Sequence, residues 1–373
     1  MDRNPAQPRD WRIALTITVV LRVFYSAVAA LASLFVHPTP GLIRTNGLTD
    51  VLPPPGGWHY ALLGVWERFD TLWYLRIAER GYDLPGAVVF YPLYPWLIRS
   101  LSWGIEPAAA ALLISTIAAF FYFLGILGLA RGEGAEISAE RVVLLAAVWP
   151  ASFFLFAGYT EALALALIVW CIAWARAQRW AAAAACAVAA GLTRSAGTLL
   201  IVPLVVMAAR AQRGGRRWLL FLAPLGTIGY WLWLRQSGRL SIAAAYRAYW
   251  NTDVAAPWTT LWLAIRSLGQ RFESLVVISL LTLTLFFIAG VLARRRAEDR
   301  WFASAVIGHM LLRVCTPPLF GAPRYLLPIY AAYLTMGDWV TSLSRDRFRL
   351  LCAALLACNL GWMWAFLSWS LVL

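Results

Sequence analysis

The chain contains no lysine, and it has few charged residues of any kind. Only 13% of its 373 residues are charged and 61% are hydrophobic, whereas about a quarter of the residues of a soluble domain are charged. This composition excludes an ordinary soluble globular protein. Apolar runs close to the length that crosses a bilayer recur from end to end. The sequence therefore predicts a polytopic membrane protein.

The short alternating segments that are typical of membrane barrels are also absent. In lipid, only helices and closed barrels satisfy the backbone hydrogen-bonding groups, and these apolar runs are too long and too uniform for barrel strands. We expect an all-α protein with about 11 transmembrane helices. No internal repeat, nucleotide-binding glycine motif or low-complexity tail divides the chain, so we expect residues 1–373 to form one transmembrane domain.

Signatures of metal and redox chemistry are missing too. The five cysteines lie in or beside apolar segments without a CxxC pair, which is typical of small buried hydrophobic residues. No DxD pair is present, and the three histidines show no spacing with carboxylates that would suggest a metal site. We expect neither a metal nor another cofactor.

All the basic residues behind the net charge of +14 are arginines. They fall in short clusters between apolar runs, which is typical of cytoplasmic loops, and we expect no nucleic-acid partner. The clusters are Arg3/Arg9/Arg12, Arg131/Arg141, Arg176/Arg179, Arg210/Arg213/Arg216/Arg217, Arg294/Arg295/Arg296/Arg300 and Arg345/Arg347/Arg349. If every cluster is cytoplasmic, an even number of crossings separates neighbouring clusters. The N-terminus is then cytoplasmic, and the first apolar run is an uncleaved span. The predicted spans are about 11–36, 107–130, 140–157, 160–177, 181–193, 196–210, 218–235, 273–293, 301–314, 324–342 and 350–371.

This topology places most of the remaining polar residues on the external face. A long first loop, 37–106, and a second loop, 236–272, both lie outside, as do turns at Glu161, Arg194 and Arg324. A charge at membrane depth that does not belong to a snorkelling loop is a functional-site hypothesis by default. We therefore expect a site on the extracytoplasmic face.

The first external loop contains a polar, aromatic stretch, WERFDTLWYLRIAERGYD, at Trp66–Asp83, which is followed by VFYPLYPWLIR at Val89–Arg99. The spacing predicts one amphipathic helix over Trp58–Arg80 and a second short one over Trp96–Trp103. Such helices suit the membrane interface. The preceding proline- and glycine-rich stretch, Pro38–Gly57, is expected to be irregular. One face of the first helix would carry Trp66, Asp70, Trp73, Tyr74 and Ile77.

Asp70 is the first candidate for chemistry, because acidic residues are scarce and this one lies among aromatic residues. A carboxylate that lipid and aromatic rings partly desolvate has a raised pKa and can act as a general base. The alternative is an ordinary interfacial aspartate paired with Arg68 or Arg76. Glu67 and Glu79 also have arginines nearby, and we expect structural roles for both.

Three further charged residues lie at the external ends of predicted helices. Glu161 is either a charge at a helix N-terminus, stabilised by the helix dipole with Thr160 as the cap, or part of the site. Arg194 and Arg324 are not explained by the positive-inside rule. Their planar guanidinium groups match phosphate oxygens. They contact either the phosphate of a lipid-borne substrate or the carboxylates of Glu161 and Asp70.

Aromatic side chains of the first loop either stack on a sugar ring or form a belt at the membrane interface. The residues concerned are Trp73, Tyr74, Tyr82, Tyr91, Tyr94 and Trp96. Among them, we assign Trp73, Tyr74, Tyr91 and Tyr94 to the substrate-binding walls of the site.

The stretch FDTLWYLRIAERGYD, with FYPLYPWLIR after it, resembles the signature of the PIG-V family of mannosyltransferases. This group contains the second mannosyltransferase of GPI-anchor synthesis and its prokaryotic relatives. Three later segments are similar to segments of the family, in the same order over most of the chain. They are GYTEALALAL at Gly158–Leu167, GLTRSAG at Gly191–Gly197 and GAPRYLLPIY at Gly321–Tyr330.

The resemblance implies a GT-C glycosyltransferase fold with its site on the extracytoplasmic face. It implies a polyprenyl-phosphate donor of the dolichyl type, with mannose as the sugar. It also implies that an aspartate of the first external loop is the catalytic base, and Asp70 is the residue at that place in the motif. The short, alanine-rich chain without lysine is typical of a GC-rich prokaryote. We therefore expect a prokaryotic plasma membrane and an acceptor that need not be a GPI intermediate.

We predict an inverting, metal-independent transferase that moves mannose to a hydroxyl group of a lipid or glycan acceptor. Asp70 would take the proton, Arg194 and Arg324 would stabilise the departing phosphate, and Glu161 would orient a sugar. Tyr325, beside Arg324, would also bind substrate. The alternatives are a flippase or transporter of a lipid-linked anion, a transferase for another sugar or a protein acceptor, and an inactive scaffold. A transporter usually has repeated halves or broken helices near the midplane, which this sequence does not show.

Overall fold

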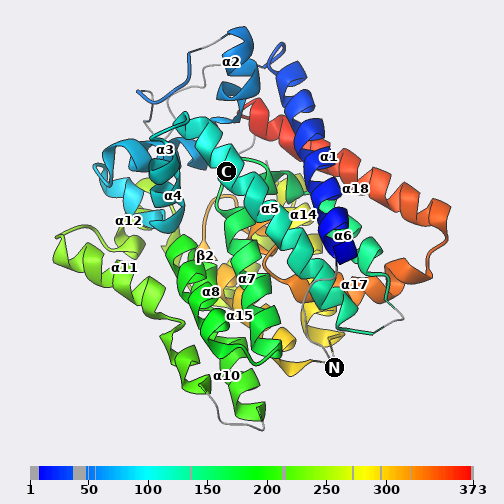
Figure 1. Ribbon diagram of the computed structural model, residues 1–373. Helices are drawn as coiled ribbons and strands as arrows, with labels where there is room; N and C mark the ends of the chain where they lie inside the picture. Colours follow the sequence, from blue (N-terminus) through cyan, green and yellow to red (C-terminus); the bar gives the residue numbers. More distant parts are fainter. Residues whose placement is uncertain are drawn as a thin grey trace.

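The computed structural model is built almost entirely of helices (Figure 1). In the described part of the chain the only strands are β1 and β2, which pair antiparallel over two residues each. The prediction of an all-α protein is therefore confirmed. Residues 37–47, 49 and 55 lie outside the described residues, and with them much of the proline-rich stretch Pro38–Gly57. The structure describes residues 8–36, 48, 50–54, 56–134, 137–211, 216–270, 273–294, 296–319 and 321–370.

The described residues form the following elements, given in chain order. The α-helices are α1 (Pro8–Ala32), α2 (Gly57–Leu62), α3 (Asp70–Arg80), α4 (Leu93–Leu101), α5 (Pro107–Arg131), α6 (Ala139–Ala147), α7 (Glu161–Arg176), α8 (Trp180–Thr193), α9 (Ser195–Thr198), α10 (Ile201–Arg210), α11 (Leu225–Gln236), α12 (Ile242–Trp250), α13 (Pro257–Arg266), α14 (Glu273–Phe287), α15 (Ala297–Leu311), α16 (Ala322–Tyr325), α17 (Tyr330–Ser342) and α18 (Arg345–Leu367). The short helices are η2 (Gly64–Trp66), η3 (Pro85–Val89), η4 (Ser152–Leu155), η5 (Arg217–Leu222) and the π-helical η6 (Ile288–Leu292). The strands are β1 (Asp253–Val254) and β2 (Arg313–Val314).

Among the described residues, four helical segments are long and apolar enough to cross a membrane. They are Arg9–Ala32, Pro107–Arg131, Ser274–Leu292 and Arg345–Leu367. The other predicted spans correspond to shorter or interrupted helices. The span predicted over 140–157 is wrong in its extent, because α6 ends at Ala147 and the chain continues through turns and η4. The total of about 11 crossings stays a prediction.

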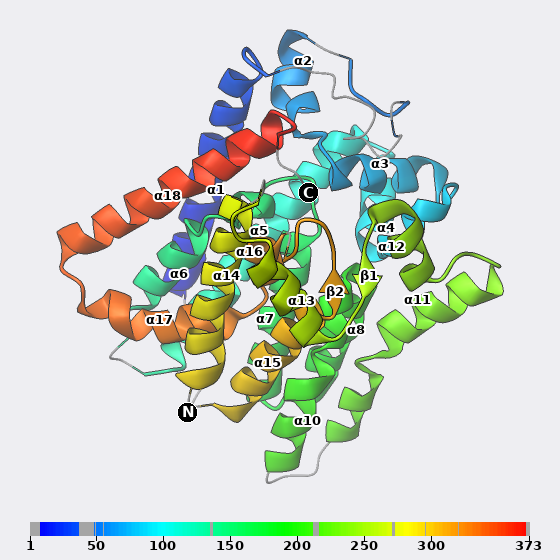
Figure 2. The ribbon, with the colours of Figure 1, turned by 180° about the vertical axis from the view of Figure 1, so that it is seen from behind.

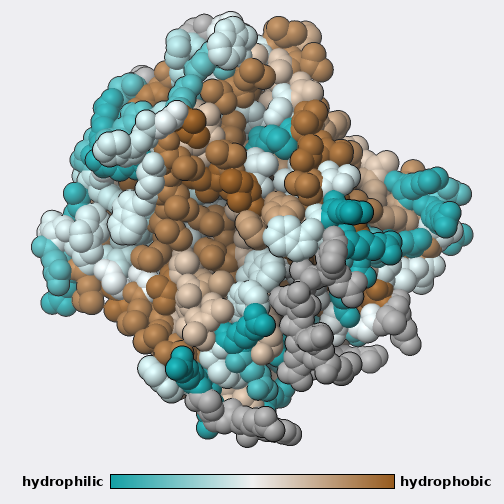
Figure 3. Space-filling model, viewed as in Figure 1, coloured by the Kyte–Doolittle hydropathy of each residue, from teal (hydrophilic) through white to brown (hydrophobic). Residues whose placement is uncertain are grey.

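Helices α1 and α18 lie on the outside of the bundle (Figures 1 and 2). Both expose large hydrophobic side chains. Val23 on α1 is 62% exposed and Leu350 on α18 is 71% exposed. Figure 3 shows hydrophobic side chains gathered across the middle of one face of the molecule, with hydrophilic side chains toward its edges. A soluble monomer rarely exposes so large an apolar surface. Together with the four long apolar segments, this surface identifies the chain as an integral membrane protein.

Near the C-terminal end of α5, arginines from several of the clusters form ion pairs with shared carboxylates. Glu133, after α5, pairs with Arg176, Arg294 and Arg296 at N–O distances of 3.1, 2.7 and 3.1 Å. Asp299 pairs with Arg176 and Arg294 at 2.9 and 2.8 Å. Arginines of several clusters that the topology places on one side of the membrane thus lie close together, and the orientation of the chain stays a prediction. Further pairs at this end are Arg131–Asp10, Arg131–Glu140 and Arg210–Glu298.

The helices of the first loop lie toward the opposite end, beside the end of α18 (Figures 1 and 2). The prediction of one helix over Trp58–Arg80 is wrong, because the chain forms α2, η2 and α3 in succession. The break falls at Phe69, whose φ is +48° and whose ring packs on Phe366 and Trp369 of the C-terminal segment at 5.8 and 4.9 Å. Trp66 therefore precedes the break and does not share a helical face with Asp70.

Helix α4 begins earlier than predicted, at Leu93 rather than Trp96. Pro92 occupies its N-cap position and Pro95 lies in its first turn. Prolines are tolerated there because the amide groups of a first helical turn have no partner within the helix. The two prolines therefore start this helix instead of breaking it.

Arg76 ties the first loop together around α3. Its guanidinium pairs with Asp50 at 2.6 Å and with Asp83 at 2.7 Å. The hydrogen bond from Arg76 lowers the pKa of Asp83. Arg68 instead donates to the backbone carbonyls of Gly64 and Leu367. Arg68 and Arg76, either of which could have paired with Asp70, thus have other partners.

Candidate functional site

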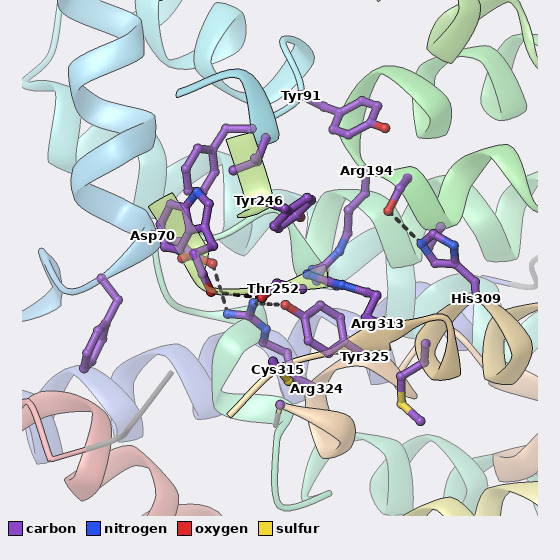
Figure 4. A pocket seen from close by; sticks show the side chains of 18 of the residues that line it. Asp70, Tyr91, Arg194, Tyr246, Thr252, His309, Arg313, Cys315, Arg324 and Tyr325 are labelled. Atoms are coloured by element: carbon purple, nitrogen blue, oxygen red, sulfur yellow. Dashed lines mark hydrogen bonds and ion pairs between the residues drawn. The ribbon is translucent and has the colours of Figure 1, made fainter. Parts of the chain in front are cut away.

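A cavity of about 430 Å³ opens where the first loop meets segments from the rest of the chain (Figure 4). Asp70 at the start of α3, the turn at Arg194, the segment around Arg324 and the second predicted loop, through Tyr246, all contribute to its walls. The structure therefore brings together four of the five segments that the topology assigns to the external face. The fifth, the turn at Glu161, lies directly behind the wall.

Asp70 is the first residue of α3, which begins at this position because of the sharp turn at Phe69. Its backbone N–H donates to the Tyr159 hydroxyl at 3.2 Å, and its carboxylate accepts from Nη1 of Arg324 at 3.0 Å. The side chain remains 18% exposed toward the cavity. Burial raises the pKa of the Asp70 carboxyl above its ordinary value, while the charge of Arg324 opposes the shift. The carboxylate is thus accessible, oriented and partly desolvated.

Glu161 links Arg194 and Arg324, the two arginines that the sequence singled out. Its Oε1 accepts from Arg194 and lies 3.3 Å from Nε of Arg324. Asp70, Arg324, Glu161 and Arg194 therefore form one chain of ion pairs. The ion pairs that the sequence left as the alternative for Arg194 and Arg324 are present. Thr160 precedes the helix, but its hydroxyl does not cap it and is instead hydrogen-bonded to the Tyr74 hydroxyl at 3.2 Å.

The GLTRSAG segment holds Arg194 in a tight turn between α8 and α9. Arg194 is extended, with φ −164° and ψ 150°, so α8 ends there and its side chain points into the cavity (Figure 4). A Cβ atom on Gly197 would lie 2.2 Å from the backbone carbonyl of Ala190, and one on Gly191 would lie 2.9 Å from the Thr227 hydroxyl. The glycines of this segment are therefore required by close packing.

The GAPRY segment places Arg324 and Tyr325 on α16. Gly321 has a φ of +73°, and a Cβ atom there would also lie 2.8 Å from the ring of Tyr325. Nη2 of Arg324 donates to the Tyr325 hydroxyl at 3.1 Å. Both side chains face the cavity (Figure 4).

The four aromatic residues predicted to bind substrate divide into two groups. Tyr74 and Tyr91 line the cavity. Trp73 and Tyr94 do not line it, and a part for them in substrate binding stays a prediction. Trp73 stacks on Phe90 at 5.5 Å, and the Tyr94 hydroxyl donates to a backbone carbonyl of α5 at 2.9 Å. These two rings support the wall from behind.

Several lining residues were missed from the sequence. Arg313 in β2, Tyr246 and Trp250 in α12, and His309 in α15 all face the cavity. Nε2 of His309 is hydrogen-bonded to the hydroxyl of Ser195 at 3.1 Å. No motif marks them, and α12 reaches the site through packing on η3 of the first loop and through β1, which follows α12 and pairs with β2. In the described ranges, no three His, Cys, Asp or Glu side chains are grouped so that they could hold a metal ion.

No family model and no curated protein matches the sequence. Among solved structures, the chain is similar to the crystal structure of ArnT from Cupriavidus metallidurans bound to undecaprenyl phosphate, with 14% sequence identity and a TM-score of 0.48. The similarity covers 92% of this chain and 64% of that chain, so this chain spans less than two thirds of the length of that protein. The similarity is distant, and the resemblance to the PIG-V family stays a prediction.

Proposed function

We propose that the protein is a GT-C membrane glycosyltransferase, which moves mannose from a polyprenyl-phosphate donor to a hydroxyl group of a lipid or glycan acceptor. One observation carries the proposal. The Asp70 carboxylate reaches a cavity whose walls combine aromatic rings with the guanidinium groups of Arg194, Arg313 and Arg324. Aromatic walls suit a sugar, guanidinium groups suit a phosphate, and a carboxylate with a raised pKa suits proton removal.

The reaction is a single displacement with inversion at the anomeric carbon. The acceptor oxygen forms a bond to that carbon while its proton passes to the carboxylate of Asp70. The bond from the anomeric carbon to the phosphate oxygen breaks, and its electron pair leaves with the polyprenyl phosphate. General-base assistance of this kind contributes about 10²- to 10⁴-fold to a rate.

Three ion pairs prepare the carboxylate for this role. Arg324 holds Asp70 at 3.0 Å and keeps its pKa from rising as far as burial alone would raise it. Glu161 does not line the cavity, and its Oε1 pairs with both Arg194 and Arg324 and holds them in place. We assign Glu161 to positioning these arginines, in place of the direct contact with a sugar that we expected from the sequence.

We place the site on the extracytoplasmic face of a prokaryotic plasma membrane, with the N-terminus in the cytoplasm. The support is the grouping of the arginine clusters at one end of the bundle, because arginine-rich ends remain cytoplasmic. The donor lipid would then reach the cavity from the outer leaflet.

A transfer assay separates this function from that of a flippase. Purified protein in liposomes is given polyprenyl-phosphate mannose that is radiolabelled in the sugar, with membrane lipids and glycans as acceptors. We expect the label to move to an acceptor and polyprenyl phosphate to be released in equal amount. Movement of intact donor between leaflets without release of polyprenyl phosphate would contradict the proposal and favour the flippase.

A further inference from the structure

Arg313 is the charged residue of the cavity that the proposed mechanism does not yet use. It lies in β2, where its backbone pairs with Val254 of β1. The Thr260 hydroxyl of α13 donates to the carbonyl of Leu311 at 2.7 Å and lies 3.4 Å from that of Arg313. The second loop thus fixes the backbone of β2, and the side chain points into the cavity (Figure 4).

The guanidinium of Arg313 has aromatic partners instead of acidic ones. It lies 4.8 Å from the ring centre of Tyr246 and 4.7 Å from that of Tyr325. Among the described residues no carboxylate forms an ion pair with it, whereas Arg194 and Arg324 pair with Glu161 and with Asp70 and Glu161, respectively. Rings on either side hold a guanidinium in place without neutralising its charge.

The charges around the cavity do not balance. Three arginines surround the single ring of Tyr325, with Arg194, Arg313 and Arg324 at 5.3, 4.7 and 5.0 Å from its centre. Only two carboxylates, Asp70 and Glu161, accompany them in the described structure. Three positive charges less two negative charges leave one excess positive charge in a partly desolvated site, and a bound anion would relieve the repulsion among the arginines.

We propose that Arg313 is the residue that binds the phosphate group of the lipid donor, while Arg194 and Arg324 chiefly hold the two carboxylates. The assignment rests on the proposed function, because it identifies the anion as the phosphate of a polyprenyl-phosphate sugar. That phosphate carries one negative charge before transfer, which matches the excess charge of the cavity. The planar guanidinium can donate two parallel hydrogen bonds to its oxygens.

The test measures binding separately from transfer. Purified wild type, Arg313→Gln, Arg313→Lys and Arg247→Gln are titrated with undecaprenyl monophosphate, undecaprenol and inorganic phosphate. Arg247 is the matched control, since its side chain is 74% exposed and pairs with Asp253 in the same second loop. Mannose transfer by each protein is recorded in parallel.

We expect Arg313→Gln to weaken binding of undecaprenyl monophosphate by about 10- to 100-fold, the loss typical of a charge-assisted hydrogen bond. Arg313→Lys should recover part of the affinity, because it keeps the charge but loses the planar fork. Arg247→Gln should bind as wild type does. Undecaprenol, which has no phosphate, should bind weakly and equally to all four proteins.

Three outcomes would overturn the assignment. If wild type transfers mannose but Arg313→Gln binds the lipid phosphate normally, Arg313 is not the phosphate residue and the transferase stands. If inorganic phosphate binds as tightly as the lipid and is lost in the same variant, the site serves free phosphate. If wild type neither binds the lipid nor transfers mannose, the proposed function fails as well. Should Arg313→Gln not fold, Arg313→Lys decides, since wild-type affinity with a lysine excludes a role for the planar fork.

Discussion

At the scale of single residues, the environment of Asp70 depends on one neighbour. Arg324 contacts its carboxylate at 3.0 Å and opposes the rise in pKa that burial causes. A general base works only when it is deprotonated, so activity is lost as the pH falls through its pKa. Arg324 therefore extends the active range of the enzyme toward lower pH.

Arg324→Gln tests this dependence. Removing the positive charge should raise the pKa of Asp70, so the acid limb of kcat/KM against pH should move to higher pH in the variant. The position of the limb is compared with that of Arg247→Gln, because the maximal rate of Arg324→Gln will also fall. A limb at the wild-type pH in both variants would mean that Asp70 is not the group that titrates.

Glu67 offers a second titration at this scale, away from the cavity. We expected a structural role beside arginines, but no described arginine pairs with the side chain, which is buried. Burial, with a smaller effect of Glu106, raises its pKa to about 7. A raised pKa means that the charged form is disfavoured in the folded protein. Stability should fall as pH rises from the unfolded pKa, near 4.5, through about 7.

Glu67→Gln removes that penalty. At pH 8 the free energy of unfolding of the variant should exceed that of wild type by up to about 3 kcal/mol, and its melting temperature should be higher. Both differences should shrink toward pH 5. Glu79→Gln, an exposed change on α3, should behave as wild type at both values. Equal melting temperatures of Glu67→Gln and wild type across the range would refute the raised pKa.

Asp70, Arg194 and Arg324 could be found from the sequence because charges are rare in so apolar a chain and each lies at a turn. Arg313 could not. Arg313 follows an apolar run and belongs to no motif. The Tyr246 ring beside its guanidinium belongs to a residue 67 positions earlier in the chain, and the two meet only after folding. The pairing of Arg194 with Glu161 likewise depends on helix packing that no spacing reveals.

At the scale of elements, the packing of α8 on α9 and α11 positions Arg194. A side chain on Gly197 would collide with the backbone of Ala190, and one on Gly226 would lie 2.1 Å from the carbonyl oxygen of Val188. The apolar runs sufficed to predict these helices and the turn between them. They did not reveal the break at Phe69, because no glycine or proline marks it. The ring of Phe69 packs on Phe366 and Trp369, which are distant in the sequence.

Gly197→Ala should therefore impair both folding and activity. Overpacking costs about 1–3 kcal/mol, and the backbone cannot give way without moving Arg194. The matched control is Gly229→Ala on α11, where an added Cβ meets nothing within 4 Å. Thermal unfolding and mannose transfer are measured for both. Loss in Gly197→Ala alone supports the packing argument, whereas equal behaviour of the two variants contradicts it.

At the scale of the whole molecule, the two ends of the bundle carry different groups of charged residues. One end gathers arginines from separate clusters, Arg176 and Arg294, in ion pairs around Glu133 and Asp299. Toward the other lie the helices of the first loop that carry Asp70. The sequence predicted this separation from the arginine clusters alone, because the positive-inside rule acts on loops rather than on tertiary contacts.

Cysteine labelling in intact cells tests the orientation. In a background without the native cysteines, Gly104→Cys between α4 and α5 should react with a membrane-impermeant maleimide from outside. Arg347→Cys at the start of α18 should react only after the membrane is permeabilised. Both positions are exposed, so access depends on the side of the membrane. The reverse pattern would place the cavity in the cytoplasmic half.

The most direct test of the account is the single-turnover rate of mannose transfer by Asp70→Asn, measured in enzyme saturated with polyprenyl-phosphate mannose. Asparagine keeps the shape of the side chain and cannot accept the proton as a base. The rate should fall by about 10²- to 10⁴-fold with little change in donor affinity, while Glu79→Gln on the same helix should keep the wild-type rate. A wild-type rate in Asp70→Asn would contradict the assignment of Asp70 as the base.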